Sequence, residues 1–165
     1  GEKIPTLYVQ NKNKNIESLF NAEINIPENF SHGNLTLENI LYIPLEYRVV
    51  FIDPYDENIF DSILADYSCI LQSCHARYEL YNAGKPVIEW NKVSMDIPHN
   101  KGLDYFNAVF NNYIDGLGDY RRVIDLLEAS QFVRMLPFKM QIDRNKMIFF
   151  YYLASKLFND ILNRK

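Results

Sequence analysis

The spacing of apolar residues along this chain follows two patterns, and one gives way to the other near residue 97. Before that point, short apolar runs alternate with polar loops. The run EYRVVFI at 46–52 is short, β-branched and aromatic, which is typical of a strand. The stretch TLENILYI at 36–43 fits either a strand or a short helix capped by Thr36. The stretches expected to form strands are 4–9, 22–27, 46–52 and 86–97, the last as one strand or as a hairpin bent near Asn91.

One long helix is expected between the strands, at about 54–82. Apolar side chains recur there with a period of 3.6 residues, from Ile59 and Ile63 to Tyr81. Gly84 and the proline that follows it provide a stop signal. The segment 1–97 is therefore predicted to be strand-rich with a single long helix.

The last part of the chain, 98–165, has helical periodicity throughout. Three helices are predicted, at about 102–115, 120–135 and 144–163, with Pro137 ending the second. Asn100, Asp119 and Asp143 stand where N-caps are needed. Together these elements predict an α+β fold in one domain, 1–165, with a small N-terminal β-sheet packed on a long central helix and on a C-terminal helical layer of about three helices.

Composition supports a packed core and sets limits on the partners. The chain has 165 residues, of which 48% are hydrophobic and 15% aromatic, enough for an ordinary core. The net charge is −4, but 121–165 holds nine basic and four acidic residues, which leaves eight basic and seventeen acidic in the other 120. A basic segment of this kind can be a docking face or a solvated helix surface.

The two cysteines indicate a reducing environment. Cys69 and Cys74 are five residues apart in one expected helix, which puts their Cα atoms roughly 8–9 Å apart, beyond the reach of a disulfide. We therefore expect free thiols and an intracellular, cytoplasmic protein. No apolar run approaches the length of a membrane helix, so no membrane association is expected.

The apolar run Val49–Ile52 is followed by Asp53, and two roles are possible for this carboxylate. As an N-cap of the long helix it would accept backbone N–H groups, with Pro54 at the first helical position. As a metal ligand it would need partners, and Glu89 and Lys92 are available in the next apolar run. That set resembles the metal-dependent nucleases of the restriction-endonuclease fold, although Glu-x-x-Lys replaces their Glu-x-Lys. The resemblance implies Mg²⁺ held by the carboxylates and a water activated for phosphodiester cleavage.

Basic and aromatic side chains are interleaved before the last expected helix. Such a mixture can bind a protein, since arginine and aromatic residues are enriched at interface hot spots, or it can bind nucleic acid. It also fits a solvated helix pair with the phenylalanines in the core. The segment RMLPFKM at 134–140 departs from helical periodicity and would be a natural contact site if exposed. The expected binding residues are Arg121, Arg122, Phe132, Arg134, Leu136, Phe138 and Lys139.

We therefore expect a non-catalytic interaction module without a cofactor. Its partner would be another protein or a second copy, bound through the C-terminal helices. One alternative is a Mg²⁺-dependent nuclease or phosphodiesterase using Asp53, Glu89 and Lys92. Another is non-catalytic nucleic-acid binding through the basic segment 121–165.

Overall fold

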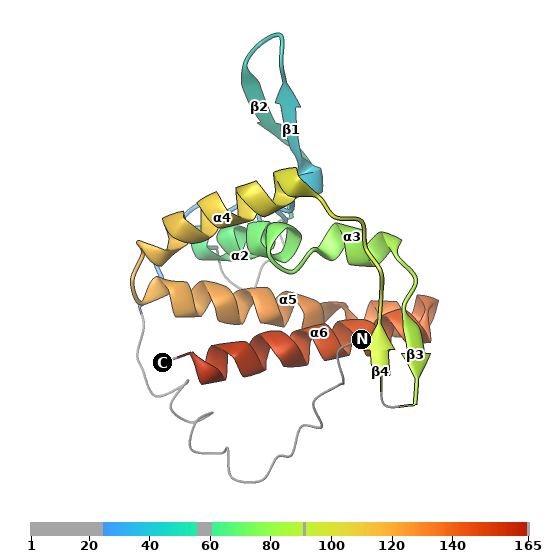
Figure 1. The fold of residues 1–165 in the computed structure, drawn as a ribbon. Coiled ribbons are helices and arrows are strands. Elements are labelled where there is room, and N and C mark those ends of the chain that lie inside the picture. The colour runs from blue at the N-terminus through green and yellow to red at the C-terminus, as the bar shows by residue number, and fades with distance from the viewer. Residues whose placement is uncertain (1–24, 56–60, 91, 165) are drawn as a thin grey trace.

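The computed structural model describes residues 25–55, 61–90 and 92–164. In this part of the chain, five α-helices form a body from which a β-hairpin projects (Figure 1). The elements are η1 (Leu37–Asn39), β1 (Ile40–Ile43), β2 (Arg48–Phe51), α2 (Ile63–Cys74), α3 (Tyr78–Ala83), β3 (Val87–Glu89), β4 (Lys92–Ser94), α4 (Lys101–Asp115), α5 (Tyr120–Ile142) and α6 (Arg144–Asn163).

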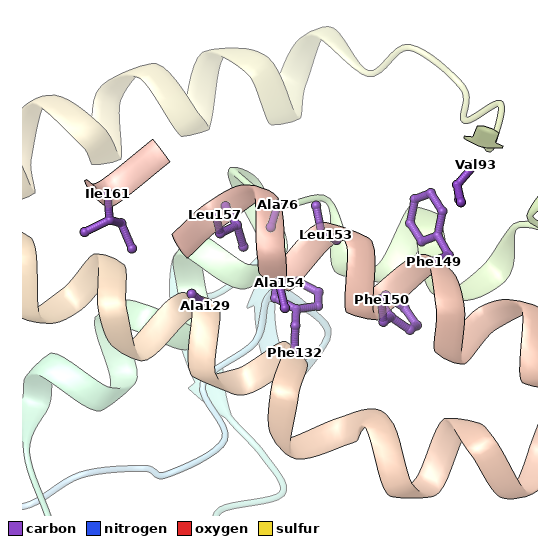
Figure 2. Packing of buried hydrophobic residues seen from close by; sticks show 10 residues of the cluster. All are labelled: Ala76, Val93, Ala129, Phe132, Phe149, Phe150, Leu153, Ala154, Leu157 and Ile161. Carbon is purple, nitrogen blue, oxygen red and sulfur yellow. The ribbon is translucent and has the colours of Figure 1, made fainter. Parts of the chain in front are cut away.

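The body is built around the two longest helices. α5 and α6 run antiparallel and side by side, and α2 and α4 cover α5 from the other side (Figure 1). One core cluster lies between α5 and α6, where Phe132, Phe149 and Phe150 fill the centre (Figure 2). A second cluster joins α2, α4 and α5 around Leu71 and Ile114. The helices therefore bury their apolar stripes on each other and not on a sheet.

The strands form two separate antiparallel hairpins. β3 pairs with β4, and Val93 of this hairpin enters the α5–α6 core. β1 pairs with β2 in the register Ile40↔Phe51 to Ile43↔Arg48, and this hairpin projects away from the helices (Figure 1). We call residues 40–51 the arm. Within the described residues neither hairpin has a third strand.

The predicted α+β class and the helical C-terminal layer are confirmed. The starts of the three C-terminal helices are also close to those predicted. Asn100 accepts the N–H of Leu103, and Asp143 accepts two N–H groups at the start of α6. Asp119 precedes α5 as expected but its side chain makes no capping hydrogen bond. Both cysteines are free and buried, as predicted.

The prediction of one helix over about 54–82 is wrong. Asp53 has a φ of 57° and is followed by irregular backbone at 54–55, so it caps no helix. Within the predicted range, the helix α2 instead begins after Ser62, whose side chain accepts the N–H of Leu64. It ends at Cys74, because Arg77 adopts a left-handed φ of 60° and α3 starts anew behind it.

Other expectations about strands have mixed outcomes. The strand expected at 46–52 is present as β2, and 36–43 supplies both the short helical turn η1 and the strand β1. The stretch 86–97 is a hairpin, one of the two forms expected. The strand expected at 4–9 lies outside the described residues, as does the first half of 22–27; residues 25–27 are irregular.

Pro137 does not end the second C-terminal helix, contrary to the prediction. α5 continues for five further residues, to Ile142. An interior proline removes one N–H donor and crowds the carbonyl of Val133, at a cost of about 3 kcal/mol. The packing of α5 along α6 offsets this cost, and the segment 134–140, which departs from helical periodicity in the sequence, is helical.

Candidate functional site

The three residues of the alternative metal-dependent site, Asp53, Glu89 and Lys92, come from two separate hairpins. Glu89 and Lys92 are cross-strand partners in the β3–β4 hairpin. Asp53 follows the other hairpin, where its carboxylate accepts a long hydrogen bond of 3.4 Å from Asn34. No group of three or more His, Cys, Asp or Glu side chains among the described residues could hold a metal ion.

The cysteines offer no nucleophile either. Burial raises the pKa of the Cys69 thiol to about 11 and that of the Cys74 thiol to about 12. Both thiols are therefore protonated at neutral pH, and a thiol reacts as its thiolate.

The expected binding residues on α5 divide into buried and exposed groups. Phe132 is 0% exposed and stacks on Phe150, so it belongs to the core and to no surface. Leu136 is half-buried against the same cluster. Phe138 is 65% exposed, and Arg122 and Arg134 are exposed as well.

The remaining two of these residues are engaged within the chain. Arg121 donates to Asp125 at 3.0 Å and also pairs with Asp115. The Lys139 ammonium donates to Asn82 at 2.7 Å and lies over two aromatic rings of the core, and its burial lowers its pKa. Much of the positive charge of the segment 121–165 is thus neutralised or held inside the fold.

A part-buried pair of His75 and Glu128 joins the end of α2 to α5. His75, the residue that follows α2, has its Nδ1 at 2.9 Å and 3.1 Å from the two carboxylate oxygens of Glu128, which is 1% exposed. The hydrogen bond that His75 donates to the Glu128 carboxylate raises the pKa of His75. Next to it, Asp125 binds Arg121 and also Arg164 at the end of α6. This network satisfies two buried carboxylates on α5 and therefore has a structural role.

The most unusual surface of the molecule is the arm. Alternate residues of a strand point to opposite faces of a ribbon, and an exposed ribbon normally has one apolar and one polar face. Here both faces are apolar. One carries Ile40, Tyr42, Val49 and Phe51, and the other carries Leu41, Ile43 and Val50, with Arg48 as the only charge.

The tip of the arm is also apolar. Leu45 is 96% exposed and Tyr47 is 87% exposed. The only charged side chains in the arm, Glu46 and Arg48, pair with each other at 2.9 Å. The arm therefore presents a neutral, apolar surface to solvent on both faces and at its tip.

Buried polar groups on α2 fix the base of the arm. The carboxylate of Asp66, which is almost fully buried, accepts the N–H groups of His32 at 2.7 Å and Gly33 at 2.8 Å. Ser73 accepts the N–H of Leu37, in the turn directly before β1, at 3.0 Å. Two buried polar side chains of one helix thus position the segment from which the arm extends.

The sequence predicts β2 as a strand but does not reveal that the arm is an exposed surface. The signal was present in the pattern: ILYI and RVVF contain one charged residue in eight positions and no polar alternation. That pattern indicates a strand covered on both faces. In the part of the chain that the structure describes, no third strand pairs with this ribbon, and Leu41, Tyr42, Val49 and Phe51 are exposed while Ile40, Ile43 and Val50 are half-buried.

A shallow hollow of about 550 Å³ lies near the base of the arm, between the loop 28–31 and Tyr55. Its charged lining residues are Glu28 and Asp61, and it adjoins the segment 56–60, which the structure does not describe. Among its described lining residues, the Ser31 hydroxyl donates a hydrogen bond to the Asp61 carboxylate at 3.0 Å. We assign no chemistry to it.

Comparison with known proteins gives no match: no family model, no curated protein and no solved structure is significantly similar to this chain. No helix among the described residues has the length and apolar character needed to cross a bilayer. The function therefore has to be argued from the surface alone.

Proposed function

We propose that this chain is a non-catalytic protein-binding module whose contact element is the arm. The observation that carries the proposal is the exposure of both apolar faces of a two-stranded ribbon. An isolated hairpin is at best marginally stable in water, and three or more strands or a packing surface are usually needed. A partner that covers the arm would supply that surface.

The size of the exposed patch supports the proposal. Tyr42, Tyr47 and Phe51 are 58%, 87% and 56% exposed. At about 200 Å² for each aromatic side chain, these three alone leave about 400 Å² of mainly apolar area in water. Patches of this size on a soluble protein commonly mark interaction sites. Tyrosine and phenylalanine are also enriched in interface cores, where charged residues are depleted.

A photoreactive amino acid placed at the arm tip tests the proposal. Position 45 would carry the probe, and position 90 would carry it in the matched control, because Trp90 is a fully exposed residue at the end of the other hairpin. Irradiation in the cells that contain the protein is expected to give discrete protein adducts from position 45 and not from position 90.

A second substitution within the arm makes the test specific. Phe51→Ser leaves the probe in place but replaces an apolar side chain on one face, so it should strongly reduce the adduct from position 45. Equal labelling from both hairpins, or no protein adduct from position 45, would overturn the proposal.

A further inference from the structure

The exposed apolar surface of the molecule continues beyond the arm onto α4. Tyr105, Phe106, Val109 and Tyr113 are all exposed on this helix. Their spacing places them along one side of the helix, and we call them the α4 stripe. No charged residue occurs between Tyr105 and Ile114. Like the arm, this surface is apolar, aromatic and neutral.

The α4 stripe and the base of the arm belong to the same end of the body. Leu37, directly before β1, and Leu103, in the first turn of α4, pack against the same core cluster around α2. In Figure 1 the arm leaves the body beside the N-terminal end of α4 and points away from it. An arm that points outward does not lie on the α4 stripe of its own chain, whose four side chains are exposed. Each copy therefore displays one projecting apolar element and one apolar helix face at one end.

We infer that the partner of the arm is a second copy of this chain, and that each arm of the dimer lies on the α4 stripe of the other copy. This inference rests on the proposed function, because it names the partner that the arm would bind. A two-fold axis at this end of the body would bring arm and stripe together twice, which is the self-complementary contact of a closed dimer. The arrangement would use both unpartnered surfaces.

Charge and area are consistent with this partner. The arm has one acid and one base, which pair with each other, so its approach to the uncharged stripe meets no like-charge repulsion. The aromatics of the stripe add about 300 Å² to the roughly 400 Å² of the arm aromatics, at about 200 Å² per fully exposed ring. The aliphatic side chains of both surfaces add to this area. The total approaches the roughly 800 Å² that each partner of a standard interface contributes.

Sedimentation velocity on the full chain over a range of concentrations is the first measurement. The expected result is a reversible dimer. Leu45→Glu in the arm and Val109→Glu in the stripe each place a charge in the contact, and each should raise the dissociation constant by about 30-fold or more. Trp90→Glu, at the tip of the other hairpin, is the matched control and should leave the constant unchanged. At concentrations where all four proteins are monomeric they should unfold at similar temperatures, because the altered side chains are exposed.

Mixing the two variants separates the inferred contact from other symmetric dimers. In a mixed dimer of Leu45→Glu and Val109→Glu chains, one arm–stripe contact carries both substitutions and the other is intact. The mixture should therefore dimerise more tightly than either variant alone. A dimer made by arm–arm or stripe–stripe contacts would gain no such unaltered contact, so an absence of rescue would overturn the inference.

The other outcomes also distinguish the inference from the proposed function. A chain that stays monomeric, and whose arm cross-links to a different protein, would overturn the second copy as partner and keep the arm as a protein-binding element. A monomer that binds neutral phospholipid vesicles through the arm, and gives no protein adduct, would overturn both.

Discussion

Replacing Phe132 by alanine tests whether this residue is a core residue and not a contact residue. Phe132 is fully buried, its ring centroid lies 5.7 Å from that of Phe150, and Tyr78 meets it edge-on at 6.4 Å. Truncation of a buried phenylalanine costs about 3–5 kcal/mol, including the cavity that remains. The two aromatic contacts, worth about 0.5–1.5 kcal/mol each, place the expected loss towards the upper part of that range.

A loss of about 4 kcal/mol is a large share of the roughly 5–15 kcal/mol that stabilises a typical protein. For a chain of this size it lowers the melting temperature by about 8–16 °C. Urea unfolding followed by far-ultraviolet circular dichroism would measure this loss of stability. Tryptophan fluorescence would not report it, because the only tryptophan, Trp90, is fully exposed in the folded state.

Phe138→Ala is the matched control for this experiment. It removes the same side chain from the same helix six residues further on, where the ring is mostly exposed. Its expected effect on stability is below about 0.5 kcal/mol. If both variants lost similar stability, or if Phe132→Ala cost less than about 1 kcal/mol, the description of the α5–α6 core would be refuted.

Three further predictions concern stability. The pKa of His75 is raised in the folded state, so the stabilisation by its pair with Glu128 is complete below the pKa of the unfolded state and is lost as the pH rises through the pKa of the folded state. Urea titrations from pH 6 to 9 should show this loss in the free energy of unfolding, and His75→Gln should abolish it. Asp143→Ala removes the cap of α6, and circular dichroism melts should show a loss of about 1 kcal/mol, with Asp143→Asn keeping most of it. Asp66→Ala leaves two buried loop amides without their acceptor, and calorimetry should show a loss of about 1–3 kcal/mol or more.

Features with local causes could be predicted from the sequence. Asn100 and Asp143 were identified as helix caps because a cap depends on two or three neighbouring residues. The β2 strand was found for a similar reason, since β-branched and aromatic residues dominate a short run.

Features that depend on tertiary packing could not be predicted from the sequence. The 3.6-residue period continues through Cys74, Tyr78 and Tyr81, so nothing in it reveals the left-handed conformation of Arg77 that separates α2 from α3. Pro137 has a helix-breaking preference that packing on α6 overrides. The exposure of the arm could not be predicted for the same reason: periodicity shows that a strand is apolar, but only the fold shows that no third strand among the described residues pairs with it.

The separation of the arm from the core has a consequence for how sequence changes at its positions would be tolerated. Side chains at Leu41, Tyr42, Leu45 and Val49 are largely exposed and do not belong to either core cluster, so polar replacements there should leave the amount of folded protein in a cell unchanged. Side chains such as Phe150 and Ile114 determine that amount. A library of variants could be scored once for abundance and once for biological activity. Substitutions in the arm would then reduce the activity score and leave the abundance score unchanged.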